Sequence, residues 1–193
     1  GFAKKAKDAG RSYCFDIIGK NLSSRILECL FAEKKENWKQ SLERDQQMFL
    51  SFFPKSNLIF DIAEENSFAS QIELADIIIF RGGDTYKLIN SLRKNLQWID
   101  KLENKTVAAT SAGVYALSEL YLDKSQPSPS IKKGLGILPI KSIVHYQSNF
   151  YNGLKKTEEE NIQFWKNVDS LMQKKRPELQ VIALKEGEHG VYD

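Results

Sequence analysis

The stretch "KTVAATSAGVYAL", residues 105–117, joins a short apolar run to a helical pattern through a single serine. The apolar run predicts a buried strand that leads directly into Ser111, and residues 113–122 have the spacing of a helix. The small neighbours Ala112 and Gly113 would let another segment of backbone approach this junction closely. A strand followed by a turn and a helix is the local unit of open parallel α/β sheets.

The same alternation extends over most of the chain. Patterns that predict strands lie at 25–32, 57–63, 75–80, 105–110 and 141–146, and helical patterns lie at 35–53, 85–95 and 113–122. The strands at 57–63 and 75–80 are continuous apolar runs, which are typical of parallel strands covered on both faces. The chain is therefore predicted to form an α/β fold with a mostly parallel sheet, whose ligands bind beyond the carboxyl ends of the strands.

The two ends of the chain fit this fold less completely. Residues 1–21 have a helical pattern, whereas a doubly wound sheet normally begins with a strand. The last stretch, "VIALKEGEHGVYD" (181–193), is typical of one strand of a hairpin and the beginning of its partner. We therefore expect a sheet that is truncated at both ends.

Length and charge exclude several classes of protein. The 193 residues predict a single domain, residues 1–193, with a substantial core. The net charge of +3 is small and the Lys and Glu residues are interspersed, which gives no basic patch for nucleic acid. Since no signal peptide and no membrane-spanning apolar run is present, we expect a cytoplasmic protein without nucleic-acid or membrane partners.

The two cysteines, Cys14 and Cys29, lie in apolar or helical stretches and are predicted to be buried free thiols of a reducing compartment. Neither the cysteines nor the two histidines have the spacing of metal ligands, so no metal site is expected.

Ser111 has two interpretations. At a strand-to-helix junction it can cap the helix, or it can be a nucleophile exposed on a tight turn whose next backbone N–H holds an oxyanion. A serine nucleophile needs a general base, and the chain offers only His145 and His189. His145 follows a predicted strand and is the better candidate, because His189 lies in a charged segment beside the end of the chain.

A second loop, "FRGGDTYKL" (80–88), also connects a predicted strand to a helix. Its paired glycines, Gly82 and Gly83, let the backbone approach a ligand and direct N–H groups toward an anion. Asp84 can cap the following helix. The loop lacks the glycine spacing of a phosphate loop, so a role in an oxyanion hole beside Ser111 is the better hypothesis.

Four stretches together resemble peptidase family S51, which contains peptidase E and cyanophycinase. They are "ADIIIFRGGDTYKLINSL" (75–92), "VAATSAGVYAL" (107–117), "GLGILPIKSIVHY" (134–146) and "VIALKEGEHGVYD" (181–193). The resemblance covers about residues 70–193. It implies a flavodoxin-like α/β fold, akin to class I glutamine amidotransferases, with helices on both faces of the sheet.

The resemblance also implies the catalytic residues. The family's nucleophile corresponds to Ser111, its base to His145 and its acid to Glu186, with Asp123 as the alternative acid. The implied activity is that of a serine-type exopeptidase or dipeptidase that hydrolyses small peptides through an acyl-enzyme, with no metal or organic cofactor.

The same comparison assigns the oxyanion hole to the backbone N–H groups of Gly83 and Ala112, and substrate binding to Gly82 and Asp84. A small peptide is the expected partner, and a homodimer is left open. The rival hypothesis is a catalytically inactive binding or regulatory protein on the same scaffold, in which Ser111 is a helix cap. A mononucleotide binder that uses the glycine pair is the weakest alternative, since it explains neither Ser111 nor His145.

The chain departs from the family pattern in two places. Many members have G-G-G-N where this chain has residues 81–84, "RGGD". Members that recognise acidic substrates carry arginines on the helix after the histidine, whereas residues 154–167 hold three glutamates and no arginine. Selectivity for an N-terminal aspartate is therefore not expected. This segment is predicted to be a helix with a solvated acidic face and with its apolar residues, Ile162, Trp165, Val168 and Met172, turned to the core.

Overall fold

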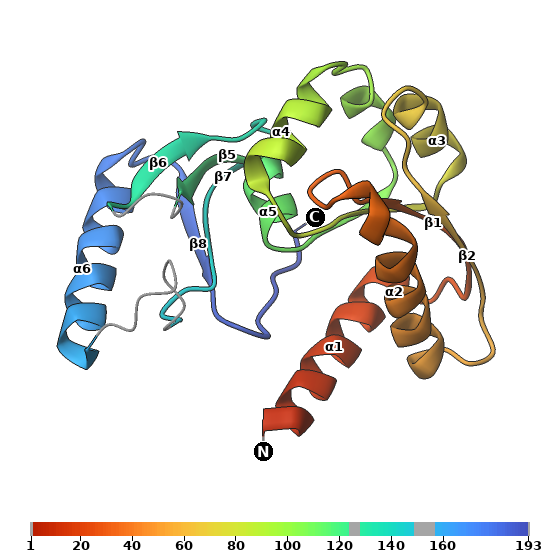
Figure 1. Cartoon of the computed structure of the whole chain (residues 1–193), viewed down its shortest axis with the longest axis horizontal. Coiled ribbons are helices and arrows are strands. Elements are labelled where there is room, and N and C mark those ends of the chain that lie inside the picture. Colours follow the sequence, from red (N-terminus) through yellow and green to blue (C-terminus); the bar gives the residue numbers. More distant parts are fainter. Residues whose placement is uncertain (1, 124–127, 149–156, 193) are drawn as a thin grey trace. The chain divides into compact units, whose positions relative to one another are not determined.

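The computed structural model describes residues 2–123, 128–148 and 157–192 (Figure 1). It divides into two compact units, residues 1–113 with 189–193, and residues 114–188. Each unit contains one four-stranded sheet. The predicted α/β class with mostly parallel strands is confirmed, and the prediction of one hydrolytic domain over residues 1–193 stays a prediction.

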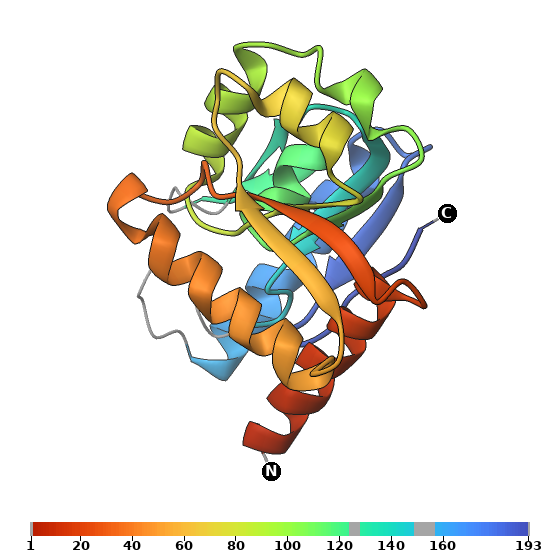
Figure 2. The same cartoon turned by 90° about the vertical axis from the view of Figure 1, so that its right-hand side faces the viewer.

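The sheet of the first unit is entirely parallel. Its strands, in the order β2-β1-β3-β4, are β1 (Ser23–Cys29), β2 (Asn57–Ile62), β3 (Ile77–Phe80) and β4 (Thr106–Ala109). Figure 2 shows β1 and β2 side by side. The helices of this unit are α1 (Phe2–Ile18), α2 (Trp38–Phe52), α3 (Phe68–Leu74) and α4 (Thr85–Arg93), with the 3-10 turns η1 (Lys35–Asn37) and η2 (Ile99–Leu102).

Helices cover both faces of this sheet, as β3 shows. Because side chains alternate along a strand, Ile77 and Ile79 lie on one face, in the cluster that contains the buried residues of α1 and α2. Phe80 points to the other face, where its ring lies 6.1 Å from that of Phe68 and 5.5 Å from that of Trp98. The prediction of a strand buried on both faces is confirmed for β3. It is wrong for β2, which is the edge strand and leaves Ile59 45% exposed.

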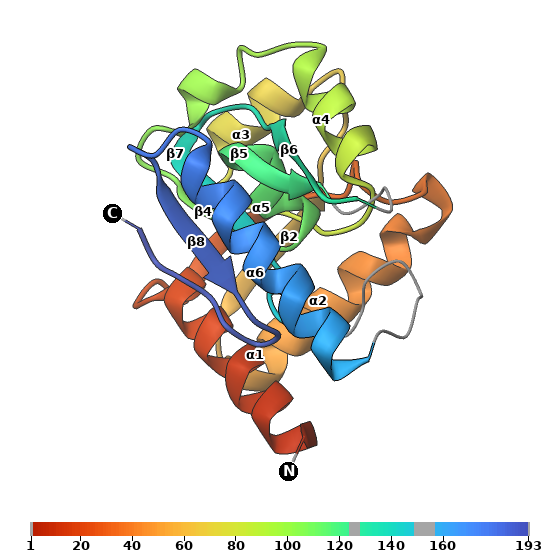
Figure 3. The ribbon, with the colours of Figure 1, turned by 90° about the vertical axis from the view of Figure 1, so that its left-hand side faces the viewer.

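The second unit has a mixed sheet. Its strands, in the order β6-β5-β7-β8, are β5 (Ser118–Asp123), β6 (Ser130–Lys133), β7 (Leu138–Val144) and β8 (Gln180–Leu184). Only the β5–β6 pair is antiparallel among these strands. Helix α6 (Glu158–Lys174) lies in front of the sheet in Figure 3 and packs its apolar residues against β5 and β7.

Both ends of α6 are capped. At the first turn, Thr157 Oγ1 accepts a hydrogen bond from the Glu160 N–H, and the Glu160 carboxylate accepts one from the Thr157 N–H. At the last turn, the buried Lys141 of β7 donates from Nζ to the carbonyls of Met172, Lys175 and Arg176 at 2.6–2.9 Å. A lysine at this position satisfies carbonyls that have no partner within the helix, and burial lowers its pKa.

Three local predictions are wrong. The helix predicted over 113–122 ends early: α5 covers only Ala112–Leu117, and the remaining residues form β5, because Leu120, Tyr121 and Leu122 are buried between β6 and β7. Ile162 is 50% exposed, and Phe164 occupies the core beside Trp165 instead.

The third error concerns the predicted hairpin at residues 181–193. Within the described residues, 185–192 contain no strand, because Lys185 and Glu188 close a turn directly after β8. The two cysteines are buried and free, as predicted. None of the helices in the described ranges is both long enough and apolar enough to cross a membrane.

Candidate active site

Ser111 occupies a strained turn between β4 and α5. Its backbone is in the left-handed region, with φ of 47°. A residue with a β-carbon rarely adopts this conformation, which costs about 1–2 kcal/mol. A residue that simply caps a helix has an extended backbone instead. The backbone at Ser111 therefore favours the geometry of an exposed nucleophile over that of an ordinary cap.

The turn is held against the end of β3. The Thr110 N–H donates to the Phe80 carbonyl at 2.9 Å, and the Gly113 N–H donates to the Thr110 carbonyl at 2.8 Å. A β-carbon on Gly113 would lie only 2.2 Å from the Phe80 carbonyl oxygen. A glycine is thus required at this position, because α5 begins in direct contact with the backbone of the neighbouring strand.

The glycine loop between β3 and α4 lies against this turn. The Gly82 N–H donates to Thr110 Oγ1 at 3.0 Å, and a β-carbon on Gly82 would lie 3.1 Å from the β-carbon of Ser111. Gly83 has φ of 138°, and a β-carbon there would lie 2.6 Å from the Ala32 carbonyl oxygen. No described residue accepts a hydrogen bond from the Gly83 N–H. The structure thus brings Gly82 and Ser111 together.

The other predicted residues of this unit begin helices. Asp84 is the N-cap of α4, where its Oδ1 accepts a hydrogen bond from the Lys87 N–H at 3.0 Å, as predicted. Ala112 is the first residue of α5, a position whose N–H has no acceptor within the helix.

His145 follows the end of β7 and contacts a carboxylate. The imidazole Nδ1 lies within hydrogen-bond distance of Glu186 Oε1, and the two side chains are 41% and 65% exposed. His145 has φ of 56°, so both Ser111 and His145 stand on left-handed turns just after strands. A carboxylate on Nδ1 favours the tautomer that carries the proton on that nitrogen, so Nε2 is the nitrogen that can accept a proton.

The sequence offered two further candidates, Asp123 as the acid and His189 as the base. Asp123 is the last residue of β5, 5% exposed, and pairs with Ser130 of β6. His189 Nε2 lies 2.5 Å from the Asp16 carboxylate of α1. No group of three or more potential metal ligands occurs in the part of the chain that the structure describes.

Tyr115 is a site residue that sequence reasoning missed. It lies on α5, four residues after Ser111, and its hydroxyl lies 3.3 Å from the backbone N and 3.4 Å from the carbonyl oxygen of Val144. Val144 is the residue directly before His145. The helix that begins after the serine therefore contacts the backbone that carries the histidine. The tyrosine's position on the predicted helix was the only signal for this role.

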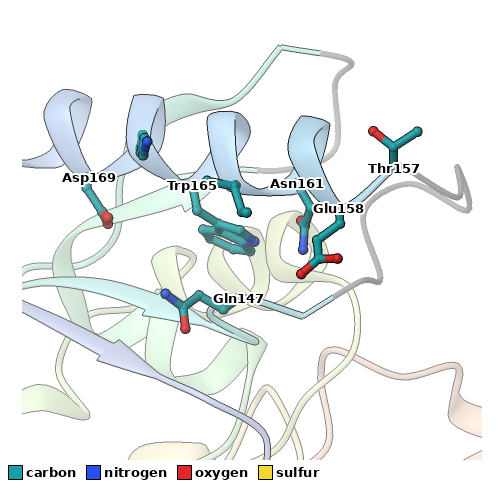
Figure 4. Close-up of a pocket in the computed structure, with 8 residues that line it drawn as sticks. Gln147, Thr157, Glu158, Asn161, Trp165 and Asp169 are labelled. Atoms are coloured by element: carbon teal, nitrogen blue, oxygen red, sulfur yellow. The ribbon is translucent and has the colours of Figure 1, made fainter.

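A hollow of about 620 Å³ lies in the second unit (Figure 4). One of its lining residues, Gln147, follows His145 by two positions in the sequence. It is lined by Gln147, Thr157, Glu158, Asn161, Ile162, Trp165, Lys166 and Asp169. Tyr146 contacts two of the lining residues. Its hydroxyl donates to Asp169 Oδ2 at 2.9 Å, and its ring lies 5.0 Å from that of Trp165.

The comparisons with known proteins agree with this geometry. The model of peptidase family S51 matches residues 32–190, which are most of the chain. The chain belongs to peptidase family S51. At the level of the family, it is a serine peptidase and a hydrolase. No curated protein matches its sequence.

Two solved structures show the S51 fold at low sequence identity. A peptidase E protein from Listeria monocytogenes EGD-e aligns with a TM-score of 0.61 and 14% identity, over 92% of this chain and 85% of that chain. A peptidase from an acI-B1 Actinobacterium aligns with a TM-score of 0.54 and 20% identity, over 81% of this chain and 68% of that chain.

Proposed function

We propose that this S51 member hydrolyses small peptides as an exopeptidase or dipeptidase, with Ser111 as nucleophile, His145 as general base and Glu186 as the acid that orients the imidazole. The observation that carries the proposal is the left-handed backbone of Ser111. This conformation is typical of a nucleophile elbow, and the neighbours Ala112 and Gly113 are small enough for a substrate to approach the turn closely.

In the proposed reaction, His145 Nε2 removes the Ser111 proton as Oγ attacks the carbonyl carbon of the scissile bond. Glu186 holds the proton on Nδ1 and stabilises the imidazolium that forms. The N–H groups of Gly83 and Ala112 donate to the tetrahedral oxyanion. The imidazolium then protonates the leaving amine, and water hydrolyses the acyl-enzyme with His145 again as base.

The roles of Gly82 and Asp84 differ from those of the oxyanion donors. Because the Gly82 N–H is already bonded to Thr110, Gly82 would contribute close approach of backbone to substrate rather than a donor. Asp84 would act through its cap on α4, which keeps its carboxylate occupied with the Lys87 N–H.

The hollow between Gln147 and α6 supports an expectation about substrate choice. Its charged residues are Glu158, Asp169 and Lys166, so carboxylates outnumber the single ammonium group. Acidic side chains would be repelled there, and we expect neutral or basic residues to be preferred. This agrees with the absence of arginine from residues 154–167.

The test is hydrolysis of a mixed dipeptide and tripeptide library, followed by mass spectrometry, with the wild type and Ser111→Ala compared. Products that form with the wild type and vanish with the variant would support a serine peptidase, and the cleaved sequences would define its specificity. Ser51→Ala, on the exposed face of α2, is the matched control and should retain all products. No products from the wild type would favour a binding protein on the same scaffold.

A further inference from the structure

A buried polar cluster lies beneath the glycine loop of the first unit. It contains Glu28 of β1, Asp45 of α2 and Arg81, the residue directly before Gly82. Glu28 is 0% exposed and Asp45 is 4% exposed. Charged side chains are almost never buried to this degree unless they are paired. None of the three contacts the substrate in the proposed reaction of Ser111.

Arg81 is held at both its backbone and its side chain. Its N–H donates to the Cys29 carbonyl at 3.1 Å, and its Nε lies 2.9 Å from Asp45 Oδ2. The Arg81 side chain is 15% exposed. A second arginine, Arg44, lies 3.7 Å from the other oxygen of Asp45, but its side chain is 63% exposed. The same carboxylate thus contacts one arginine in the interior and one at the surface.

Glu28 completes the cluster as a neutral acid. No donor among the described residues reaches its carboxyl oxygens, and the protonated group itself donates a hydrogen bond to the Asp45 carboxylate. Burial and the negative charge of Asp45 raise the pKa of Glu28 to about 9, with Arg81 opposing the shift. The charge of Glu33 and the buried Tyr13 hydroxyl also face this region.

The charge balance of the cluster follows from this protonation. With Glu28 neutral, the guanidinium of Arg81 faces a single carboxylate, Asp45, and the buried charges cancel. An ionised Glu28 would add an uncompensated negative charge inside the unit.

The loop that Arg81 precedes is otherwise held through its backbone. Gly82 and Gly83 have no side chains, and the loop contacts its surroundings through the Gly82–Thr110 hydrogen bond, the Asp84 N–H, which donates to the Ala32 carbonyl at 2.9 Å, and the close approach of Gly83 to Ala32. An arginine that is paired in the interior restricts the backbone at the position where the loop begins. A residue without that pairing would leave the glycine pair free to sample other conformations.

We propose that Arg81 is a positioning residue, which its ion pair with Asp45 tethers so that the Gly83 N–H stays in place to donate to the oxyanion. This inference rests on the proposed peptidase function. It predicts an effect on kcat rather than on KM, because an oxyanion donor acts only once the tetrahedral intermediate forms.

The experiment compares Arg81→Met and Arg81→Lys with the control Arg44→Met, which removes the surface arginine from the same carboxylate. Two readouts are taken: kcat and KM on the best peptide of the library, and backbone amide exchange measured by NMR for residues 82–85. The exchange readout does not depend on catalysis, so it tests the tether even if the wild type hydrolyses no peptide.

We expect Arg81→Met to lower kcat at least 10-fold with KM changed less than 2-fold. It should also raise exchange at least 10-fold relative to α4 at Gly82 and Asp84, whose N–H groups donate to Thr110 and Ala32. Arg81→Lys should recover part of both effects, and Arg44→Met should change neither. Unchanged exchange at the loop, or exchange raised uniformly across the first unit, would overturn the proposal.

A second variant guards against failure of Arg81→Met to fold. Asp45→Asn keeps the volume of the side chain and removes the charge that holds Arg81. It should produce the same local rise in exchange at Gly82 and Asp84, and an unaffected loop would again contradict the tether.

Discussion

The two halves of the proposed catalytic machinery are built in different ways. Ser111 stands on a turn in which backbone groups of three segments are in close contact, and a β-carbon on Gly113 would overlap the Phe80 carbonyl. His145 and Glu186 instead contact each other through two partly exposed side chains. The nucleophile is thus positioned by tightly packed backbone, whereas the base contacts an exposed carboxylate. Stability and activity should therefore respond differently to substitutions in the two regions.

Among substitutions that leave Ser111 in place, the largest effect on activity is expected from Glu186→Gln. The amide cannot keep the proton on Nδ1 as a carboxylate does, so we expect kcat to fall roughly 10³- to 10⁴-fold. The free energy of unfolding should change by less than about 0.5 kcal/mol, because the Glu186 side chain is mostly exposed. Steady-state kinetics and urea unfolding measure the two quantities.

Two further variants sharpen this result. Glu188→Gln alters a carboxylate two residues away that accepts from the Lys185 N–H, and should retain full activity. Asp123→Asn tests the alternative acid. If Asp123→Asn abolishes hydrolysis and Glu186→Gln does not, the assignment of the acid is wrong.

Gly113→Ala should have the largest effect on stability. The new β-carbon would lie 2.2 Å from the Phe80 carbonyl oxygen, so the start of α5 must move. We expect a loss of about 3 kcal/mol in the free energy of unfolding, measured by chemical denaturation. Gly10→Ala is the matched control, since its β-carbon would meet only Met48 Sδ at 3.9 Å within α1, and it should stabilise the protein by up to about 1 kcal/mol. Equal effects of the two substitutions would contradict the tight fit at Gly113.

Glu28→Gln should change how stability depends on pH. Because the pKa of Glu28 is raised from 4.5 to about 9, the folded protein retains a proton that the unfolded chain has lost between these pH values. Folding stability therefore falls as pH rises through this window, by up to about 1.4 kcal/mol per pH unit. Glutamine removes this loss. The stability of the variant relative to that of the wild type should therefore increase from pH 5 to pH 8, where the folded wild type holds about one more proton than its unfolded chain.

Denaturation curves at several pH values measure this difference. The control Glu43→Gln, on the exposed face of α2, should leave the pH dependence of the wild type unchanged. Parallel stability profiles for the wild type and Glu28→Gln would show that Glu28 is ionised in the folded protein, contrary to its burial.

Ser111→Gly should change the free energy of unfolding only slightly. Glycine adopts φ of 47° without strain, but it also raises the entropy of the unfolded chain. We expect the two terms to leave a net stabilisation of about 0.5 kcal/mol, while hydrolysis is lost. In the control Ser51→Gly, inside α2, the same change should destabilise by about 0.5 kcal/mol. Thermal unfolding of both variants checks this, and a destabilised Ser111→Gly would argue against strain at the turn.

Local patterns predicted much of the fold. The strands near residues 25, 57, 77 and 106 are confirmed, and so are the helices predicted over 35–53 and 85–95, because hydrophobic periodicity is a local signal. The helix predicted over 113–122 was wrong because its second half pairs with β6 and β7, and pairing partners distant in sequence leave no local signal.

For the site, the sequence by itself determined which residues could carry the chemistry. Ser111 at a strand-to-helix junction, the glycine pair and one well-placed histidine follow from residue type and position along the chain. Only the tertiary structure decided which distant groups they contact: Glu186 lies 41 residues from His145, and Asp45 lies 36 residues before Arg81. Such contacts form because sheet and helix packing brings separate elements together, and nothing in the local sequence encodes the partner.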